Sequence, residues 1–197
     1  MNANNYNMMM ENQISALDKK PSLLLHCCCA PCSSACLERL KEFFDITVFF
    51  YNPNIGDGEY LKRKAELLRL ISETGWAKTA DCGHDPAEYY SAVRGLESEK
   101  EGGKRCEACF ALRLAKTAEA AEKLGCDYFG TTLTISPLKN AALINRIGEQ
   151  LSVGKSVHWL YSDFKKRGGY LRSLRLSEQY GLYRQSYCGC EFSKRGN

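Results

Sequence analysis

The stretch Leu23–Cys32 reads LLLHCCCAPC, and it places four cysteines directly after an apolar run. The leucines predict a buried strand, and the proline predicts the start of a helix. Neighbouring side chains on a strand point to opposite faces, so Cys28 and Cys29 can face one point only if the chain turns. A strand-to-helix turn brings them together, and the helix N-terminus lowers the pKa of a thiol placed there. We therefore expect a metal or redox centre at this turn.

The number of cysteines strengthens that expectation. A buried free cysteine often serves only as a small hydrophobic residue, which would explain one or two of the four. The chain of 197 residues has 11 cysteines, and others recur later in Cys-x-x-Cys and Cys-x-Cys spacing. The N-terminus lacks the pattern of a secretory signal, so we expect a cytoplasmic protein, in which structural disulfides are rare. Cysteines in such a chain indicate metal binding or redox catalysis.

Outside this turn, predicted strands and helices alternate. The predicted strands cover residues 22–26, 45–51, 76–80, 127–132 and 157–160. The predicted helices cover residues 33–44, 59–74, 86–93, 106–124, 137–151 and 169–180. This order favours a layered α/β domain over residues 21–197, with a parallel sheet covered by helices on both faces. We interpret residues 1–20 as a flexible or loosely docked N-terminal extension.

The loops and the composition limit the classes of function. Ligands of parallel sheets bind beyond the carboxyl ends of the strands, where four of the informative loops should converge. The chain has no Gly-rich phosphate loop, so ATP hydrolysis and hydride transfer from a tightly bound nicotinamide receive no support. No apolar run approaches the roughly 20 residues of a membrane span, so we expect no membrane partner.

Two further cysteine pairs carry chemical information. Cys106 and Cys109 open a predicted helix, and their spacing suits a redox dithiol, half a zinc site or half an iron–sulfur site. Together with Cys28 and Cys29 they would supply the four thiolates of a [4Fe–4S] cluster. A disulfide within Cys188-Gly189-Cys190 would be strained and easily reduced, which suits an electron relay. Two further metal ligands or two idle thiols are the alternatives for that pair.

The C-terminal segment is basic. Eight basic residues against three acidic ones give residues 163–197 a net charge of +5, while the whole chain carries +4. Aromatic residues interleave with these charges, and such a mixture can contact phosphates and unpaired bases. We expect the nucleic-acid contacts to involve Lys165, Lys166, Arg167 and Arg172. An ordinary solvated helix face explains the charge alone equally well.

Five separated motifs, in order, resemble one known family. They are His26-x-Cys28-Cys29-Ala30-Pro31-Cys32, Tyr51-Asn52-Pro53-Asn54-Ile55, Arg105-Cys106-x-x-Cys109-Phe110 with Arg113-Leu114, Thr131-Thr132-Leu133-x-Ile135-Ser136-Pro137-x-Lys139-Asn140, and a tail ending in Tyr183-Arg184-Gln185-x-Tyr187-Cys188-Gly189-Cys190. The family is that of the cobalamin-independent epoxyqueuosine reductases of the QueH type. The similarity covers about residues 23–193.

The resemblance implies a fold and an activity. The fold is a Rossmann-like layered domain of the nucleotide alpha-hydrolase-like kind. The reaction is the reduction of epoxyqueuosine to queuosine at the wobble position of tRNA, with electrons from an external donor. By motif position, Cys28, Cys29, Cys106 and Cys109 resemble the ligands of a [4Fe–4S] cluster, and Cys188 and Cys190 resemble a redox-active disulfide pair. A second adjacent metal ion, iron, is also implied, with Cys32 where a further ligand is expected.

Two other functions remain compatible with the residues. A non-catalytic zinc or iron–sulfur RNA-binding module would share the cysteines and the basic tail but show no turnover. A thiol-based redox protein without metal would need only the dithiols. The metal content of anaerobically purified protein distinguishes the three.

Overall fold

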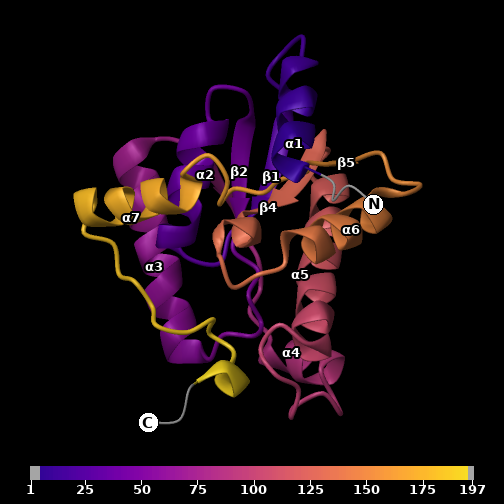
Figure 1. Ribbon diagram of the computed structural model, residues 1–197, viewed down its shortest axis with the longest axis vertical. Helices are drawn as coiled ribbons and strands as arrows, with labels where there is room; N and C mark the ends of the chain where they lie inside the picture. The colour runs from indigo at the N-terminus through magenta and orange to yellow at the C-terminus, as the bar shows by residue number, and fades with distance from the viewer. Residues whose placement is uncertain (1–4, 195–197) are drawn as a thin grey trace.

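A computed structural model describes residues 5–194 and places five parallel strands in one sheet between two layers of helices (Figure 1). The strands are β1 (Ser22–His26), β2 (Asp45–Phe49), β3 (Lys78–Ala80), β4 (Tyr128–Thr131) and β5 (His158–Trp159), in the order β3-β2-β1-β4-β5. The predicted α/β domain with a layered parallel sheet is confirmed.

The two helix layers cover opposite faces of the sheet. The helices are α1 (Tyr6–Ser15), α2 (Ala30–Leu40), α3 (Asp57–Thr74), α4 (Pro86–Ala92), α5 (Lys104–Lys123), α6 (Ala141–Ser152) and α7 (Gly169–Gln179). Apolar side chains of α1, α2, α3 and α7 join one core cluster, and those of α5 and α6 join another. Figure 1 shows α2, α3 and α7 on one side of the strands and α5 and α6 on the other.

Strand β1 is the middle strand of the sheet, and both of its faces are buried. Leu23 and Leu25 enter the core cluster of α2 and α7, whereas Leu24 enters that of α5 and α6. All three leucines are fully buried. A continuous apolar run is typical of a parallel strand that is covered on both sides.

The strand order reverses between β1 and β4, which are hydrogen-bonded neighbours. Strands β2 and β3 follow on one side of β1, and β4 and β5 lie on the other. In such sheets a ligand site forms beyond the carboxyl ends of the strands at this switch point. The cysteine turn after β1 and the short 3-10 helix Thr132–Ile135 after β4 both lie there.

Several predicted element bounds differ from the structure by a few residues, and the start of the sixth helix has a local cause. Helix α6 begins at Ala141 and not at Pro137, because the side chain of Asn140 caps it by accepting a hydrogen bond from the Leu143 backbone N–H at 3.1 Å. The extension expected over residues 1–20 contains α1, whose Met10 is fully buried in the core. The described part of that extension is therefore docked.

The limits of the described chain bear on two other expectations. Residues 1–4 of the extension and residues 195–197 of the domain, including Arg195 of the basic tail, lie outside the described residues. Within residues 5–194, none of the helices has the combination of length and apolar character needed to cross a bilayer.

Candidate metal and redox site

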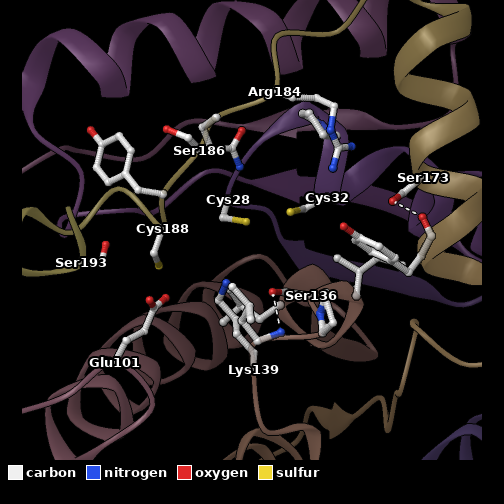
Figure 2. Close-up of a pocket in the computed structure, with 18 of the residues that line it drawn as sticks. Cys28, Cys32, Glu101, Ser136, Lys139, Ser173, Arg184, Ser186, Cys188 and Ser193 are labelled. Carbon is white, nitrogen blue, oxygen red and sulfur yellow. Dashed lines mark hydrogen bonds between the residues drawn. The ribbon is translucent and has the colours of Figure 1, made fainter. Parts of the chain in front are cut away.

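Three cysteines gather at the turn between β1 and α2. Cys29 is the N-terminal cap of α2, with Pro31 in the first turn, and Cys28 directly precedes it. The Sγ atoms of Cys28, Cys29 and Cys32 all lie within 4.8 Å of one another. In Figure 2 the sulfurs of Cys28 and Cys32 point toward each other across the cavity. The strand-to-helix turn thus brings the sulfurs together as the sequence predicts.

The spacing of this trio suits one metal ion. A tetrahedral ion with metal–sulfur bonds of about 2.3 Å holds its sulfur ligands roughly 3.8 Å apart. The Sγ atoms of Cys28 and Cys29 lie 3.9 Å apart. In the part of the chain that the structure describes, no other group of three metal-ligating side chains is this close, and Cys106 and Cys109 lie outside the trio.

The three thiols of the trio differ in how readily they lose a proton. The S–H groups of Cys29 and Cys32 beside Cys28, together with Lys139 and Arg113, lower the pKa of Cys28 well below its usual value. The same contact with Cys28 raises the pKa of Cys29 to about 12 and raises that of Cys32. A thiol of lowered pKa beside two cations is suited to give up its proton to a metal ion.

Cys106 and Cys109 lie in the first turns of α5 and line a second cavity of about 80 Å³. Burial raises the pKa of both thiols, to about 12 for Cys109. This cavity adjoins a larger one of about 180 Å³ that contains Cys28 and Cys32. Lys139 and Cys188 line both cavities and therefore lie between the two groups of cysteines.

Arg113 of α5 interacts with cysteines of both groups, the turn after β1 and the start of α5. It is 1% exposed and forms no ion pair with a carboxylate of residues 5–194. Its guanidinium donates to Asn52 Oδ1 at 2.5 Å and to His26 Nε2 at 3.2 Å, and it lies 3.9 Å from Cys109 Sγ. Burial alone would lower the pKa of Arg113, but Cys109, Cys28 and Cys188 around it raise that pKa.

His26 has a structural role beside this cation. Burial, with Arg113 next to it, lowers the pKa of His26 to about 3, so the ring is neutral. Its Nε2 lies 3.2 Å from the Arg113 Nε donor and 3.0 Å from the Tyr51 carbonyl oxygen, and its Nδ1 is hydrogen-bonded to Thr131 Oγ1 at 2.8 Å. This hydrogen bond joins the ends of β1 and β4, where the strand order reverses.

Lys139 is a second cation at the site. It follows the 3-10 helix after β4 and forms no ion pair within the described residues. Burial acts to lower its pKa, but Cys188, Cys28 and Cys32 outweigh burial and raise it. Two cations without carboxylate partners beside a cysteine set fit an anionic, thiolate-bound metal centre.

Gln185 touches the trio from the C-terminal segment. Its Nε2 donates to Cys29 Sγ at 2.9 Å, while its Oε1 is buried without a hydrogen-bond partner among the described residues. Tyr170, Ser173 and Arg184 line the same cavity, and Arg184 reaches into it opposite Lys139 (Figure 2). A free buried acceptor in a cavity is available to a bound molecule.

The cysteines of Cys188-Gly189-Cys190 are both free thiols. They differ in surroundings, because Cys190 is buried against the hydroxyl of Tyr89 from α4 and lines only the smaller cavity, whereas Cys188 lines both cavities. The structure thus brings this predicted pair to the same site as the other predicted cysteines.

The predicted nucleic-acid residues are placed differently. Lys165 pairs with Asp163, and Arg167 and Arg172 pair with Glu11 and Glu38 of other helices. Lys166 forms no ion pair in the described part of the chain. These four residues do not line the cysteine cavities, and Arg184 is the basic residue of the C-terminal segment that does.

Sequence reasoning assigned no role to Arg113, Lys139 or Gln185. All three lie inside the motifs that carried the family resemblance, which was the signal available. Tyr89 and Arg63 lie outside those motifs. Only the folded structure shows that they contact the Cys188–Cys190 segment.

Comparison with known proteins gives a consistent result. The family model described as "Epoxyqueuosine reductase QueH" matches residues 23–196. Three relatives carry that same description. The chain is 45% identical to the one from Streptococcus pyogenes, over 97% of this chain and 78% of the relative. It is 41% identical to the one from Staphylococcus epidermidis, over 96% and 84%, and 37% identical to the one from Thermotoga maritima, over 87% and 90%.

Proposed function

The chain belongs to the epoxyqueuosine reductase QueH family, and from that premise we propose that it reduces epoxyqueuosine to queuosine at the wobble position of tRNA. This is the last step of queuosine synthesis. The observation that carries the proposal is the cavity of about 180 Å³, which is lined by Cys28, Cys32, Lys139 and Cys188. The thiol of Cys188, the Lys139 cation and a potential metal centre therefore face one space.

The electrons and atoms of the reaction balance with the groups at this site. Converting the epoxide to an alkene removes one oxygen as water, which consumes two electrons and two protons. Oxidation of the Cys188 and Cys190 dithiol to a disulfide releases two electrons and two protons. An external thiol donor then returns the pair to the dithiol, so each turnover consumes two equivalents of a monothiol.

The metal sites are part of the proposal. A [4Fe–4S] cluster on Cys28, Cys29, Cys106 and Cys109, with a further iron ion on Cys32, would supply single-electron transfer and Lewis-acid help for the departing oxygen. What supports this assignment is that Arg113 interacts with both Cys28 and Cys109.

The remaining residues of the cavity have roles that follow from their chemistry. Lys139 carries a proton into the space between the cysteine groups and would donate it to the leaving oxygen. The free Oε1 of Gln185 would accept a hydrogen bond from a hydroxyl or N–H of the substrate. Tyr170 and Arg184 offer an aromatic face and a guanidinium to an unstacked base and its phosphates.

The basic residues outside the cavity would contact the tRNA backbone. Lys166 is available for a phosphate, whereas Lys165, Arg167 and Arg172 must exchange carboxylate partners for phosphates. Such an exchange adds less binding free energy than a phosphate contact made by an unpaired lysine, because the protein's own ion pair is lost. We propose that the protein acts in the cytoplasm, where its tRNA substrate is found.

The test combines metal analysis with nucleoside analysis. Protein purified anaerobically is assayed for iron and sulfide and then incubated with tRNA from a strain lacking its own epoxyqueuosine reductase. We expect queuosine to appear, and to be lost in Cys28→Ser and Cys109→Ser proteins together with most of the iron. Cys36→Ser and Cys126→Ser are matched controls, because neither residue lines the cavities. Full iron in the Cys109→Ser protein would remove that residue from the metal centre.

A second candidate is a zinc-bound RNA-binding module without turnover. The observation that favours it is the close trio of Cys28, Cys29 and Cys32, which suits one tetrahedral ion. A colourless protein with one zinc ion and no formation of queuosine would establish it in place of the reductase.

A further inference from the structure

We propose that the two cysteines of the Cys188-Gly189-Cys190 segment have separate roles, which Arg63 and Tyr89 fix as positioning residues. Cys188 is the thiol that faces the cavity and forms mixed disulfides, and Cys190 is the resolving thiol. The inference rests on the proposed reductase function and deepens it.

The first observation is a buried arginine beneath the segment. Arg63 of α3 is 1% exposed, and its Nε is anchored by Glu59 Oε1 at 2.6 Å. Its Nη1 donates to the Cys188 carbonyl at 3.0 Å and its Nη2 to the Tyr187 carbonyl at 3.2 Å. A planar guanidinium that bonds two successive carbonyls fixes both the position and the direction of the chain at that point.

The second observation is the conformation of Gly189. Its φ is +107°, a value that favours glycine. A Cβ at this position would lie 2.7 Å from Ile55 Cγ1 and 3.0 Å from Arg63 Nη1. The backbone therefore packs directly on the arginine and on the core, and it turns sharply there. The two cysteine side chains leave the turn toward different surroundings.

The third observation is the unequal environment of the two sulfurs. Cys190 is 7% exposed, and its Sγ lies 2.9 Å from the hydroxyl of Tyr89, which is itself 2% exposed. Burial and the contact with Cys190 raise the pKa of Tyr89, so the hydroxyl keeps its proton and can donate a hydrogen bond to a thiolate at Cys190. Cys188 is less buried, lines both cavities and extends toward Glu101 and Lys139 (Figure 2).

The chemistry follows from this asymmetry. When the pair is oxidised, the two S–H bonds break, one S–S bond forms, and two electrons and two protons leave toward the epoxide. In the return step an external monothiol attacks Cys188, the less buried sulfur of the pair, and the S–S bond breaks. Cys190 departs as a thiolate that Tyr89 stabilises by its hydrogen bond, and a better-stabilised leaving thiolate departs faster. A second thiol then reduces the mixed disulfide on Cys188 and restores the dithiol.

The test locates the mixed disulfide. Anaerobic holoprotein with the pair oxidised is mixed with limiting glutathione, quenched in acid and digested, and the glutathione adduct is assigned by peptide mass spectrometry. We expect at least tenfold more adduct on Cys188 than on Cys190. Equal labelling, or a majority on Cys190, would overturn the proposal.

Variants test the two positioning residues. In Tyr89→Phe we expect the preference for Cys188 to fall below threefold and reduction of the disulfide to slow about tenfold. Tyr90→Phe is the control, because Tyr90 is 47% exposed and, within the described residues, the hydroxyl that hydrogen-bonds the Cys190 sulfur is that of Tyr89. In Arg63→Lys, whose ammonium lacks the guanidinium fork, we expect a similar loss of preference at unchanged iron content. An unchanged preference in Tyr89→Phe would overturn the role of that residue.

These measurements use no tRNA, so they separate this inference from the proposed function. If Cys188→Ser and Cys190→Ser proteins retain normal formation of queuosine, the redox role in the reductase fails, whatever the glutathione experiment shows. If those variants lose turnover but labelling is equal, the reductase stands and the division of roles fails.

Discussion

Replacing Arg113 by methionine tests whether the site is built for a negatively charged metal centre. Methionine keeps most of the volume but removes the charge and the donors. Asn52 Oδ1 and His26 Nε2 would lose their hydrogen bonds to the guanidinium. An unsatisfied buried group costs about 1–3 kcal/mol, and this cost falls on Asn52 Oδ1, because His26 Nε2 keeps its contact with the Tyr51 carbonyl oxygen at 3.0 Å.

An opposing effect applies only to the metal-free protein. There the guanidinium is buried without a carboxylate, and removing such a charge regains several kcal/mol of desolvation. We therefore expect the unfolding free energy of metal-free Arg113→Met to lie within about 2 kcal/mol of the parent. In the metal-loaded protein the thiolates balance the charge, and the variant loses that attraction.

The expected consequence is a lower metal affinity at nearly unchanged apoprotein stability. Loss of a residue that supports metal ligands typically lowers affinity 10–100-fold, which corresponds to about 1.4–2.7 kcal/mol. Anaerobic denaturation of the metal-free and metal-loaded forms measures the two unfolding free energies, and iron analysis measures the metal content. Arg113→Lys retains the charge and should recover part of the iron. Parental iron content in Arg113→Met, with parental stabilisation on loading, would refute the reasoning.

Three further predictions follow from particular contacts. In Gly189→Ala the positive φ would strain the backbone by about 1–3 kcal/mol, so we expect the Cys188–Cys190 segment to shift and turnover of tRNA to fall at least tenfold. Calorimetry should show only a small change in melting temperature. Binding of tRNA should weaken as salt rises, and Lys166→Ala should reduce the salt slope more than Lys165→Ala, measured by fluorescence anisotropy; equal slopes would contradict this. Hydrogen bonding to Arg69 lowers the pKa of Glu66, so ionised Glu66 stabilises the fold above its unfolded pKa of about 4.3, and this stabilisation is lost as pH falls through the lowered pKa. The urea midpoint of unfolding should therefore fall less steeply with decreasing pH in Glu66→Gln than in the parent.

The central part of the fold could be predicted because its signals are local. The leucine run, the cysteines and Pro31 define β1, the turn and the start of α2 within ten residues. Alternation of strands and helices then implies a parallel sheet whose loops meet at the carboxyl ends of β1 and β4. The proximity of the cysteine groups follows from that topology.

The missed features depend on partners that are far apart in the sequence. The charge of the basic tail counts Arg167 and Arg172 as free cations, but Glu11 and Glu38 lie more than 130 residues away and neutralise them. In the same way, Arg113 falls on a helix rich in charged residues, and nothing local distinguishes its buried position from a solvated one.

Helix α1 has a consequence for assembly as well as for packing. Gln13 donates its side-chain N–H to the Trp159 carbonyl at 2.8 Å and accepts from the Tyr161 backbone N–H at 3.0 Å. A neighbouring strand would use these same two backbone groups, which lie two residues apart beside β5. One glutamine amide thus occupies the position of a sixth strand. An open strand invites pairing with another chain, so this side chain protects the sheet against edge-to-edge aggregation.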